Sequence, residues 1–249
     1  MLKRILKRVS TQGQRAFVSK HANNFLDLVA PSCERQLLRA SFSAWGEDRI
    51  IDAWLTIKGV PPASIRYLDV GAAYPVFLSN TYLFYRAGGK GVLVEPDPSQ
   101  GTELSAVRPR DTLLPVGVTH TGQRKASLIQ MSSPVFNTFV QSFADKAVEQ
   151  SKGWADYQRQ EITGRVEVDL VSMNEILSQH FSTGDLHILS IDVEGMDFQL
   201  LASVDFGRFL PWAICAEVAV PKEQFLELLA PHGYTLVAVT PDNYVFFRV

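Results

Sequence analysis

The sequence predicts an α/β fold: a mostly parallel sheet with helices on both faces and one antiparallel strand. Short apolar strands alternate with helical stretches from about residue 66 onward. An apolar strand over 66–70 runs directly into a turn at Gly71, and a second strand, 91–94, ends in Glu95. A strand, a glycine turn, a helix and a second strand ending in an acid form the nucleotide-binding half of a Rossmann-type unit.

The first helices are bounded by clear stop signals. A helix is expected from about Glu47, because apolar residues recur there at helical spacing until Gly59 and two prolines end it. A second helix, over 79–87, is stopped by two consecutive glycines. The next expected elements are a helix around 99–107 and a strand over 112–118.

Residues 119–165 interrupt this alternation. They contain one strand-like run, 126–131, followed by a polar stretch with no clear periodicity. A long irregular insertion in a compact domain usually has a function, such as covering a pocket. We therefore expect this segment to help enclose a hydroxylated substrate. The residues expected to contact that substrate are Asn80, Thr81, Asn137 and Thr138.

Regular structure returns after the insertion. A strand over 166–170 leads to Ser172 and Glu175, which fit a capping box that opens a helix to about Phe181. The remaining elements are a strand over 188–191, a helix over 196–202, a strand over 213–216, a helix over 221–230, and strands over 235–240 and 244–249. The last two strands form a hairpin, which makes one strand antiparallel.

Acidic residues stand at the ends of four predicted strands, at Asp69, Glu95, Asp192 and Glu217. Ligands of open parallel sheets bind outside the carboxyl ends of the strands, where an unpaired carboxylate is costly. Asp192 and Glu217, the catalytic candidates, together with Glu194 form an oxygen-rich set suited to Mg²⁺ or Mn²⁺. Without a metal, Asp192 is a candidate general base for a hydroxyl group.

Other catalytic chemistries have little support in the sequence. His187 begins its strand, at the end of the sheet opposite to the acids. The histidines without a recognisable partner are His21, His120, His180 and His232. The sequence contains no nucleophilic-serine elbow, zinc-ligand spacing or phosphate-binding loop.

The turn after the first strand discriminates between nucleotide ligands. Ala72 and Ala73 stand where a dinucleotide site has further glycines, which fit a pyrophosphate against a helix. A ligand with ribose and adenine but no phosphate, such as S-adenosylmethionine, needs those glycines less. Glu95 would bind its ribose, and the backbone at Val116-Gly117 would flank its adenine. The residues expected to bind the cofactor are Asp69, Gly71, Ala72, Asn80, Glu95, Val116 and Asp192.

The chain resembles the FkbM-type S-adenosylmethionine-dependent methyltransferases over residues 41–247. The matching segments are 43–51, 68–75, 79–83, 94–98, 137–139, 189–195 and 216–217, with Leu68-Asp69-Val70-Gly71-Ala72-Ala73 and Ile191-Asp192-Val193-Glu194-Gly195 among them. The resemblance implies a class I methyltransferase fold with a seven-stranded sheet. It also implies methyl transfer to oxygen, often a hydroxyl on a sugar or a polyketide-like secondary metabolite. We expect a small-molecule, sugar or lipid-linked glycan acceptor.

Two positions depart from the family pattern. Members often carry Asn or His after the Gly-Ala pair, whereas this chain has Ala73-Tyr74. Trp45 replaces a Gln-like residue before Gly46-Glu47-Asp48, which bears on the substrate rather than the fold. Two alternative functions stay open, an NAD-dependent oxidoreductase and a non-catalytic cofactor-binding module. The missing glycines argue against the first, and the intact acids at the strand ends argue against the second.

Composition sets limits on partners and location. The chain has 249 residues, 46% of them hydrophobic, which is enough for one full core. Basic and acidic residues nearly balance, 24 against 26, so no global field points to nucleic acid. We expect a cytoplasmic protein with two reduced thiols, Cys33 and Cys215, because no apolar run approaches the roughly 18 residues of a membrane span. The sequence leaves open whether it forms a homo-oligomer.

The N-terminal segment is predicted to be a helical extension, residues 1–40, of a catalytic domain over 41–249. Residues 1–9 place four apolar side chains on one helical stripe and four cations on the other face. Such a helix can lie weakly on an anionic membrane, which would place the protein at the inner membrane face. Alternatively, this segment is a frayed terminus or a helix packed against the domain.

Overall fold

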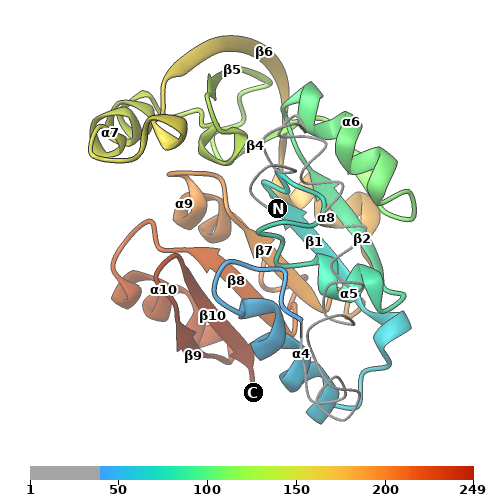
Figure 1. Ribbon diagram of the computed structural model, residues 1–249. Coiled ribbons are helices and arrows are strands. Elements are labelled where there is room, and N and C mark those ends of the chain that lie inside the picture. Colours follow the sequence, from blue (N-terminus) through green and yellow to red (C-terminus); the bar gives the residue numbers. More distant parts are fainter. Residues whose placement is uncertain (1–39) are drawn as a thin grey trace. The chain divides into compact units, whose positions relative to one another are not determined.

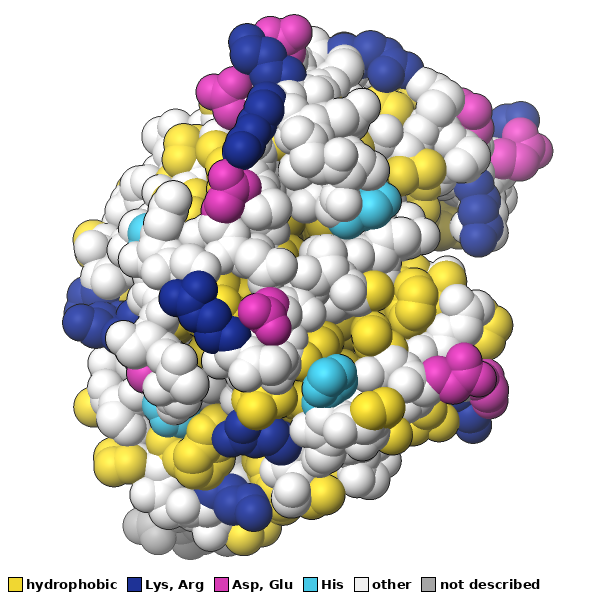
Figure 2. Space-filling model, turned by 180° about the vertical axis from the view of Figure 1, so that it is seen from behind, with side chains coloured by type: hydrophobic (Ala, Val, Ile, Leu, Met, Phe, Trp, Pro, Cys, Tyr) yellow, Lys and Arg dark blue, Asp and Glu magenta, His cyan; other side chains and the backbone are white. Residues whose placement is uncertain are grey.

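A computed structural model describes residues 40–249 (Figure 1). Residues 1–39 lie outside the described residues. They include nearly all of the expected helical extension, the amphipathic segment 1–9, His21 and Cys33. Among the helices from residue 40 onward, none is both long and apolar enough to cross a membrane. On the face drawn in Figure 2, basic and acidic side chains are interspersed among exposed hydrophobic ones.

Seven strands form the main sheet in the order β3-β2-β1-β7-β8-β10-β9. Neighbouring strands are parallel from β3 to β8, and β10 runs antiparallel to both β8 and β9. The strands are β1 (Arg66–Val70), β2 (Lys90–Val94), β3 (Thr112–Leu114), β7 (Ile188–Ile191), β8 (Ala213–Glu217), β9 (Tyr234–Val239) and β10 (Asn243–Arg248). This order, with its single reversed strand, confirms the class I methyltransferase fold.

Helices cover both faces of the sheet because its strands bury side chains on both sides. In β10, Tyr244 and Phe246 pack on one face, while Val245 and Phe247 pack on the other. The first face is covered by α8 (Met173–His180), α9 (Asp197–Ala202) and α10 (Lys222–Leu229), and the second by α4 (Glu47–Ile57), α5 (Tyr82–Arg86) and α6 (Pro98–Val107). The 3₁₀ turns are Pro62–Ser64, Pro134–Phe136, Asp156–Gln158 and Ala230–His232.

The expected capping box is confirmed, whereas the helix expected over 79–87 is shorter than predicted. The capping box of α8 is present, with the Ser172 N–H donating to Glu175 at 2.9 Å and the Glu175 N–H donating back at 3.3 Å. Helix α5 begins later than expected. The Ser79 hydroxyl accepts from the N–H groups of Thr81 and Tyr82, at 3.3 and 3.1 Å, and so holds the preceding turn.

The prediction of a single strand over 112–118 is wrong. The chain forms β3 and then a separate strand, β4 (Gly117–Thr119), which pairs with β6 in a second sheet. Pro115 stands between them. Proline cannot donate to a strand ladder, so the chain leaves the main sheet at this point.

The expectation of an irregular insertion at 119–165 is also wrong. The segment contributes β5 (Lys125–Met131), the start of β6 (Ile162–Ser172) and α7 (Gln141–Ser151). Strands β4, β6 and β5 form a three-stranded sheet, drawn at the top of Figure 1 with α7 beside it. The insertion therefore has a small core of its own, in which Ala144 and Ala147 of α7 pack against Ile129 and Met131.

Candidate active site

A hollow with about 530 Å³ of empty space, open to solvent, lies at the carboxyl ends of β1, β2 and β7. Its lining includes seven residues singled out from the sequence: Gly71, Glu95, Val116, Gly117, Asn137, Asp192 and Glu194. The rest of the wall is largely apolar and includes Val94, Pro96, Val118, Leu128, Pro134, Val135 and Phe139.

Gly71 brings the first strand turn against the end of β7. Its φ angle is 84°, a conformation that favours glycine. A Cβ atom here would lie 1.8 Å from the carbonyl oxygen of Asp192. The Gly71 N–H donates to the Val94 carbonyl at 3.0 Å, and the Asp192 N–H donates to the Val70 carbonyl at 2.9 Å. Only glycine allows this close contact between the turn and the strand that carries Asp192.

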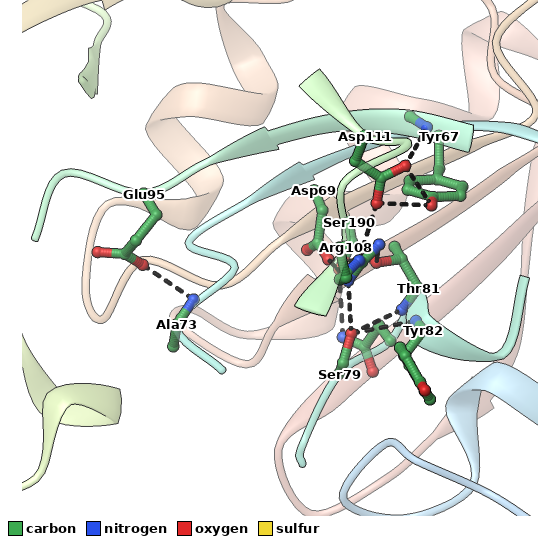
Figure 3. A network of polar contacts seen from close by, with 12 residues as sticks. Tyr67, Asp69, Ala73, Ser79, Thr81, Tyr82, Glu95, Arg108, Asp111 and Ser190 are labelled. Carbon is green, nitrogen blue, oxygen red and sulfur yellow. Dashed lines mark hydrogen bonds and ion pairs between the residues drawn. The ribbon is translucent and has the colours of Figure 1, made fainter. Parts of the chain in front are cut away.

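Glu95 is held at the end of β2 by two backbone donors. Oε2 accepts from the Ala73 N–H at 2.9 Å (Figure 3), and Oε1 accepts from the Asp97 N–H at 2.8 Å. Burial raises the pKa of Glu95 to about 7, although these two hydrogen bonds act to lower it. Each oxygen of an ionised carboxylate has a further lone pair. Glu95 is therefore fixed and can still accept from a pair of ribose hydroxyls.

Asp192, Glu194 and Glu217 form an acid cluster beside Gly71. Each offers a carboxylate oxygen, and these oxygens lie within 4.8 Å of one another. Burial raises the pKa of all three carboxyl groups. The nearby Asp197 raises the pKa of Asp192 further, and Asp192 raises those of Glu194 and Glu217. Three like charges this close are unfavourable without protons or a cation to offset them.

The turn that carries Asp192 and Glu194 has a strained backbone that hydrogen bonds hold in place. Glu194 has a φ angle of 59°, uncommon for a residue with a side chain. The Asp197 carboxylate accepts from the N–H groups of Val193 and Gly195, at 2.8 and 3.1 Å. The Thr138 hydroxyl donates to the Glu194 carbonyl at 2.7 Å. Such bracing of an unfavourable conformation is typical of functional sites.

The acid cluster suits a hard divalent cation. Opposite ligands of octahedral Mg²⁺ lie about 4.2 Å apart, since each oxygen is about 2.1 Å from the ion. The observed 4.8 Å spread needs only small side-chain rotations to reach that value. Oε2 of Glu217 is also buried without a hydrogen-bond partner among the described residues. Asp192, Glu194 and Glu217 are therefore the residues that would hold a metal.

Asp69 lies behind the hollow rather than in its wall. It accepts from the Thr81 hydroxyl, and its Oδ2 lies 4.0 Å from Nη1 of the fully buried Arg108. Arg108 also donates from Nε to Asp111 at 2.8 Å and from Nη2 to Thr81 at 3.0 Å (Figure 3). The Tyr67 hydroxyl donates to the same Asp111 carboxylate at 2.7 Å. This buried network fixes β1 and the segment that follows it.

Sequence reasoning missed Arg108 and Asp111, because their other partners, Tyr67, Asp69 and Thr81, are distant in the chain. Of the other expected residues, Asp69, Ala72, Asn80, Thr81, Thr138 and Glu217 do not belong to the lining of the hollow. Asn80 donates to the Ser190 hydroxyl at 3.2 Å behind it. The contacts expected between these residues and a ligand stay predictions.

Asn137 does line the hollow, but its amide is engaged. Its Oδ1 accepts from the Met131 N–H and its Nδ2 donates to Asp97, both at 2.8 Å. Gln130 donates to the same Asp97 oxygen at 3.2 Å. Asn137 thereby joins the insertion to the loop after β2, so the two walls of the hollow are tied together.

Several solved structures share features of the chain at low identity. A TehB-like SAM-dependent methyltransferase from Corynebacterium glutamicum is 14% identical, with a TM-score of 0.41, covering 94% of this chain and 100% of that one. An O-methyltransferase from Bacillus cereus, solved in complex with SAH, is 11% identical, with a TM-score of 0.40 and coverage of 90% and 94%. An N1-methyltransferase for 1,6-didemethyltoxoflavin from Burkholderia thailandensis is 12% identical, with a TM-score of 0.37 and coverage of 94% and 84%.

Comparison with curated proteins gives no match. The family model of the methyltransferase FkbM domain matches residues 69–235, well over half of the 249-residue chain. The matched range contains the Gly71 turn, Glu95 and the acid cluster. The resemblance found in the sequence is therefore confirmed. The chain belongs to the FkbM-domain family of S-adenosylmethionine-dependent methyltransferases.

Proposed function

We propose that this protein transfers the methyl group of S-adenosylmethionine to a hydroxyl oxygen of a sugar, a glycan or another hydroxylated metabolite. The observation that carries this proposal is the acid cluster beside Gly71, at the edge of the hollow. A hydroxyl must lose its proton as it accepts a methyl group, and a carboxylate of raised pKa is suited to take it.

Different residues of the hollow contact different parts of the cofactor. Glu95 accepts from the ribose hydroxyls, the Gly71 turn lets the backbone approach the ligand, and Val116 flanks the adenine ring. With the cofactor held in this way, its sulfonium centre lies near Asp192 and supplies an electrophilic methyl group. Aligning that methyl with the acceptor oxygen removes much of the entropic barrier.

Asp192 is the proposed proton acceptor. The acceptor oxygen forms the new bond to the methyl carbon, and the carbon–sulfur bond breaks with its electron pair going to sulfur. The hydroxyl proton goes to the Asp192 carboxylate, so the products are the methyl ether and neutral S-adenosylhomocysteine. The burial that raises the pKa of Asp192 also makes its carboxylate a stronger base.

A divalent cation held by Asp192, Glu194 and Glu217 would supply a second way to lower the pKa of a bound hydroxyl. The three carboxylate oxygens within 4.8 Å and the unpartnered, buried Oε2 of Glu217 support this version. In that case Asp192 contributes as a ligand, and the hydroxyl loses its proton to solvent or to a neighbouring carboxylate.

The test is Asp192→Asn, assayed as S-adenosylhomocysteine release with a panel of glycosides and hydroxylated metabolites. We expect the variant to fold and bind cofactor but to lose on the order of 10²-fold or more in kcat. Exposed Glu227→Gln is the matched control and should keep full turnover. Chelator inhibition reversed by Mg²⁺ or Mn²⁺ would select the metal version. Near-normal turnover of Asp192→Asn contradicts both versions.

A further inference from the structure

The segment before α4 is held in place by buried acids. The Asp48 carboxylate accepts from the Phe42 N–H at 2.7 Å and from the Ser43 hydroxyl at 3.1 Å. Glu47 Oε2 accepts from the Trp45 N–H at 2.9 Å. Both acids are fully buried. The backbone that carries Trp45 is therefore fixed, although it belongs to a surface loop.

Glu47 also ties this segment to the hairpin between β9 and β10. Its Oε1 accepts from the Thr240 hydroxyl at 2.7 Å and from the Asn243 amide at 3.1 Å. These partners lie 193 and 196 residues away in the chain. The Gly-Glu-Asp motif thus positions the neighbouring side chain, Trp45, against the turn that joins the last two strands.

Trp45 is a large apolar side chain fixed in an exposed position. It is 57% exposed, yet its indole N–H donates to the Asp242 carboxylate at 2.6 Å. The hydrogen bond sets the orientation of the ring and leaves much of its surface to solvent. An oriented, exposed aromatic ring loses little entropy on binding a ligand.

Asp242, the partner of Trp45, lies in the turn beside the strand end that carries Glu217 of the acid cluster. Asn243, the next residue, is paired with Glu217 across β8 and β10, and the Val218 N–H donates to the Asp242 carbonyl at 2.9 Å. The hollow, the acid cluster, Asp242 and Trp45 therefore follow one another outward along the carboxyl edge of the sheet.

We propose that Trp45 and Asp242 form the acceptor-recognition surface, and that they bind a neutral sugar ring whose hydroxyl reaches the acid cluster. This assignment rests on the proposed transfer to a hydroxyl oxygen. Trp45 and Asp242 are specificity-determining residues in this account, whereas Asp192 takes part in the chemistry.

The chemistry of the pair selects the ligand class. The face of an indole ring carries negative potential, which attracts the polarised C–H groups on the flat side of a sugar ring. The exposed Asp242 carboxylate accepts from hydroxyls at the edge of that ring. The exposed Asp242 carboxylate beside the ring disfavours an acceptor that carries a carboxylate or phosphate at this point.

Fluorine NMR tests the assignment directly. The chain has four tryptophans, so protein containing 5-fluorotryptophan gives four resonances, and Trp45→Phe identifies that of Trp45. The protein, saturated with S-adenosylhomocysteine, is titrated with methyl glucoside, galactoside, mannoside and rhamnoside. Methyl glucuronide provides an anionic arm and methyl glucosaminide a cationic one. Trp212 is the internal control. Its backbone N–H donates to the His187 carbonyl, at the opposite ends of the strands.

We expect at least one neutral glycoside to shift the Trp45 resonance saturably without moving that of Trp212. Asp242→Ala should weaken this binding at least tenfold, and methyl glucuronide should not bind. Trp45→Ala, at an exposed position, should leave the affinity for S-adenosylhomocysteine unchanged. If S-adenosylhomocysteine binds but no neutral glycoside shifts the Trp45 resonance, or only the glucosaminide does, the recognition surface is refuted and the cofactor site stands. Failure of S-adenosylhomocysteine to bind refutes the proposed function itself.

Discussion

The carbonyl oxygen of Asp192 occupies the space that a Cβ atom on Gly71 would need, 1.8 Å from that position. The cofactor turn and the proposed base are thus in direct backbone contact across β1 and β7. Any change that moves the turn also moves Asp192. In the proposed mechanism, cofactor binding and proton transfer are therefore coupled through Gly71.

Gly71→Ala should weaken S-adenosylhomocysteine binding at least tenfold and lower the urea midpoint of unfolding. Gly184→Ala is the matched control, since Gly184 has nearly the same φ, 88° against 84°, but nothing within 4 Å of its Cβ position. The control carries only the cost of placing alanine in the left-handed conformation, about 1–2 kcal/mol. Equal effects of the two substitutions on stability and binding would show that the contact with Asp192 is unimportant.

Cofactor affinity should depend on pH through Glu95. Burial raises its pKa to about 7, so the carboxyl group takes up a proton as the pH falls through 7. The protonated form accepts fewer hydrogen bonds from ribose, and affinity should fall by up to about tenfold per pH unit below that value. Calorimetry between pH 6 and 8 measures this. The Glu95→Gln variant should lose the dependence, and a flat profile in the unmodified protein would contradict the assignment.

Arg108→Met should be among the most destabilising single changes in the domain. It leaves the buried Asp69 and Asp111 carboxylates without their cation, at a cost of about 3–5 kcal/mol. Arg124→Met is the control, because the Arg124–Glu175 pair is largely exposed at 71% and 39%. Urea unfolding should show a large drop in midpoint for the first variant and little change for the second. A small effect of Arg108→Met would mean that the network is not structural.

The insertion should become protected when the hollow is filled. Leu128, Pro134, Val135, Asn137 and Phe139 all belong to its wall. Amide hydrogen exchange over 126–139 should therefore slow when cofactor and acceptor are added, because contacts with ligand suppress local opening. Helix α8 serves as the reference segment and should be unaffected. Identical exchange over 126–139 with and without ligands would show that the insertion is not part of the pocket.

Local patterns predicted the main sheet well. The strands at 66–70 and 188–191 were placed at their observed bounds, because each is a short apolar run closed by polar or glycine residues. Helix α7 was missed. Its Phe143, Ala144, Ala147 and Val148 do recur at helical spacing, but the segment has no side-chain cap and few strongly apolar residues.

The candidate site was predictable where its signal is local. Gly71 and Glu95 belong to one strand-turn-strand unit, so adjacent residues reveal them. Arg108 was not predictable, because Thr81, one of its partners, lies 27 residues away and only the fold brings them together. The same holds for Trp45 and Asp242, which are 197 residues apart.

Calorimetric titration with S-adenosylhomocysteine tests whether Gly71 and Glu95 hold S-adenosylmethionine. We expect saturable binding at one site, weakened at least tenfold, or about 1.4 kcal/mol, by Glu95→Ala. Exposed Glu227→Ala should bind as the unmodified protein does, and NAD should give no binding heat. Unchanged affinity in Glu95→Ala, or no binding to the unmodified protein, would contradict the account.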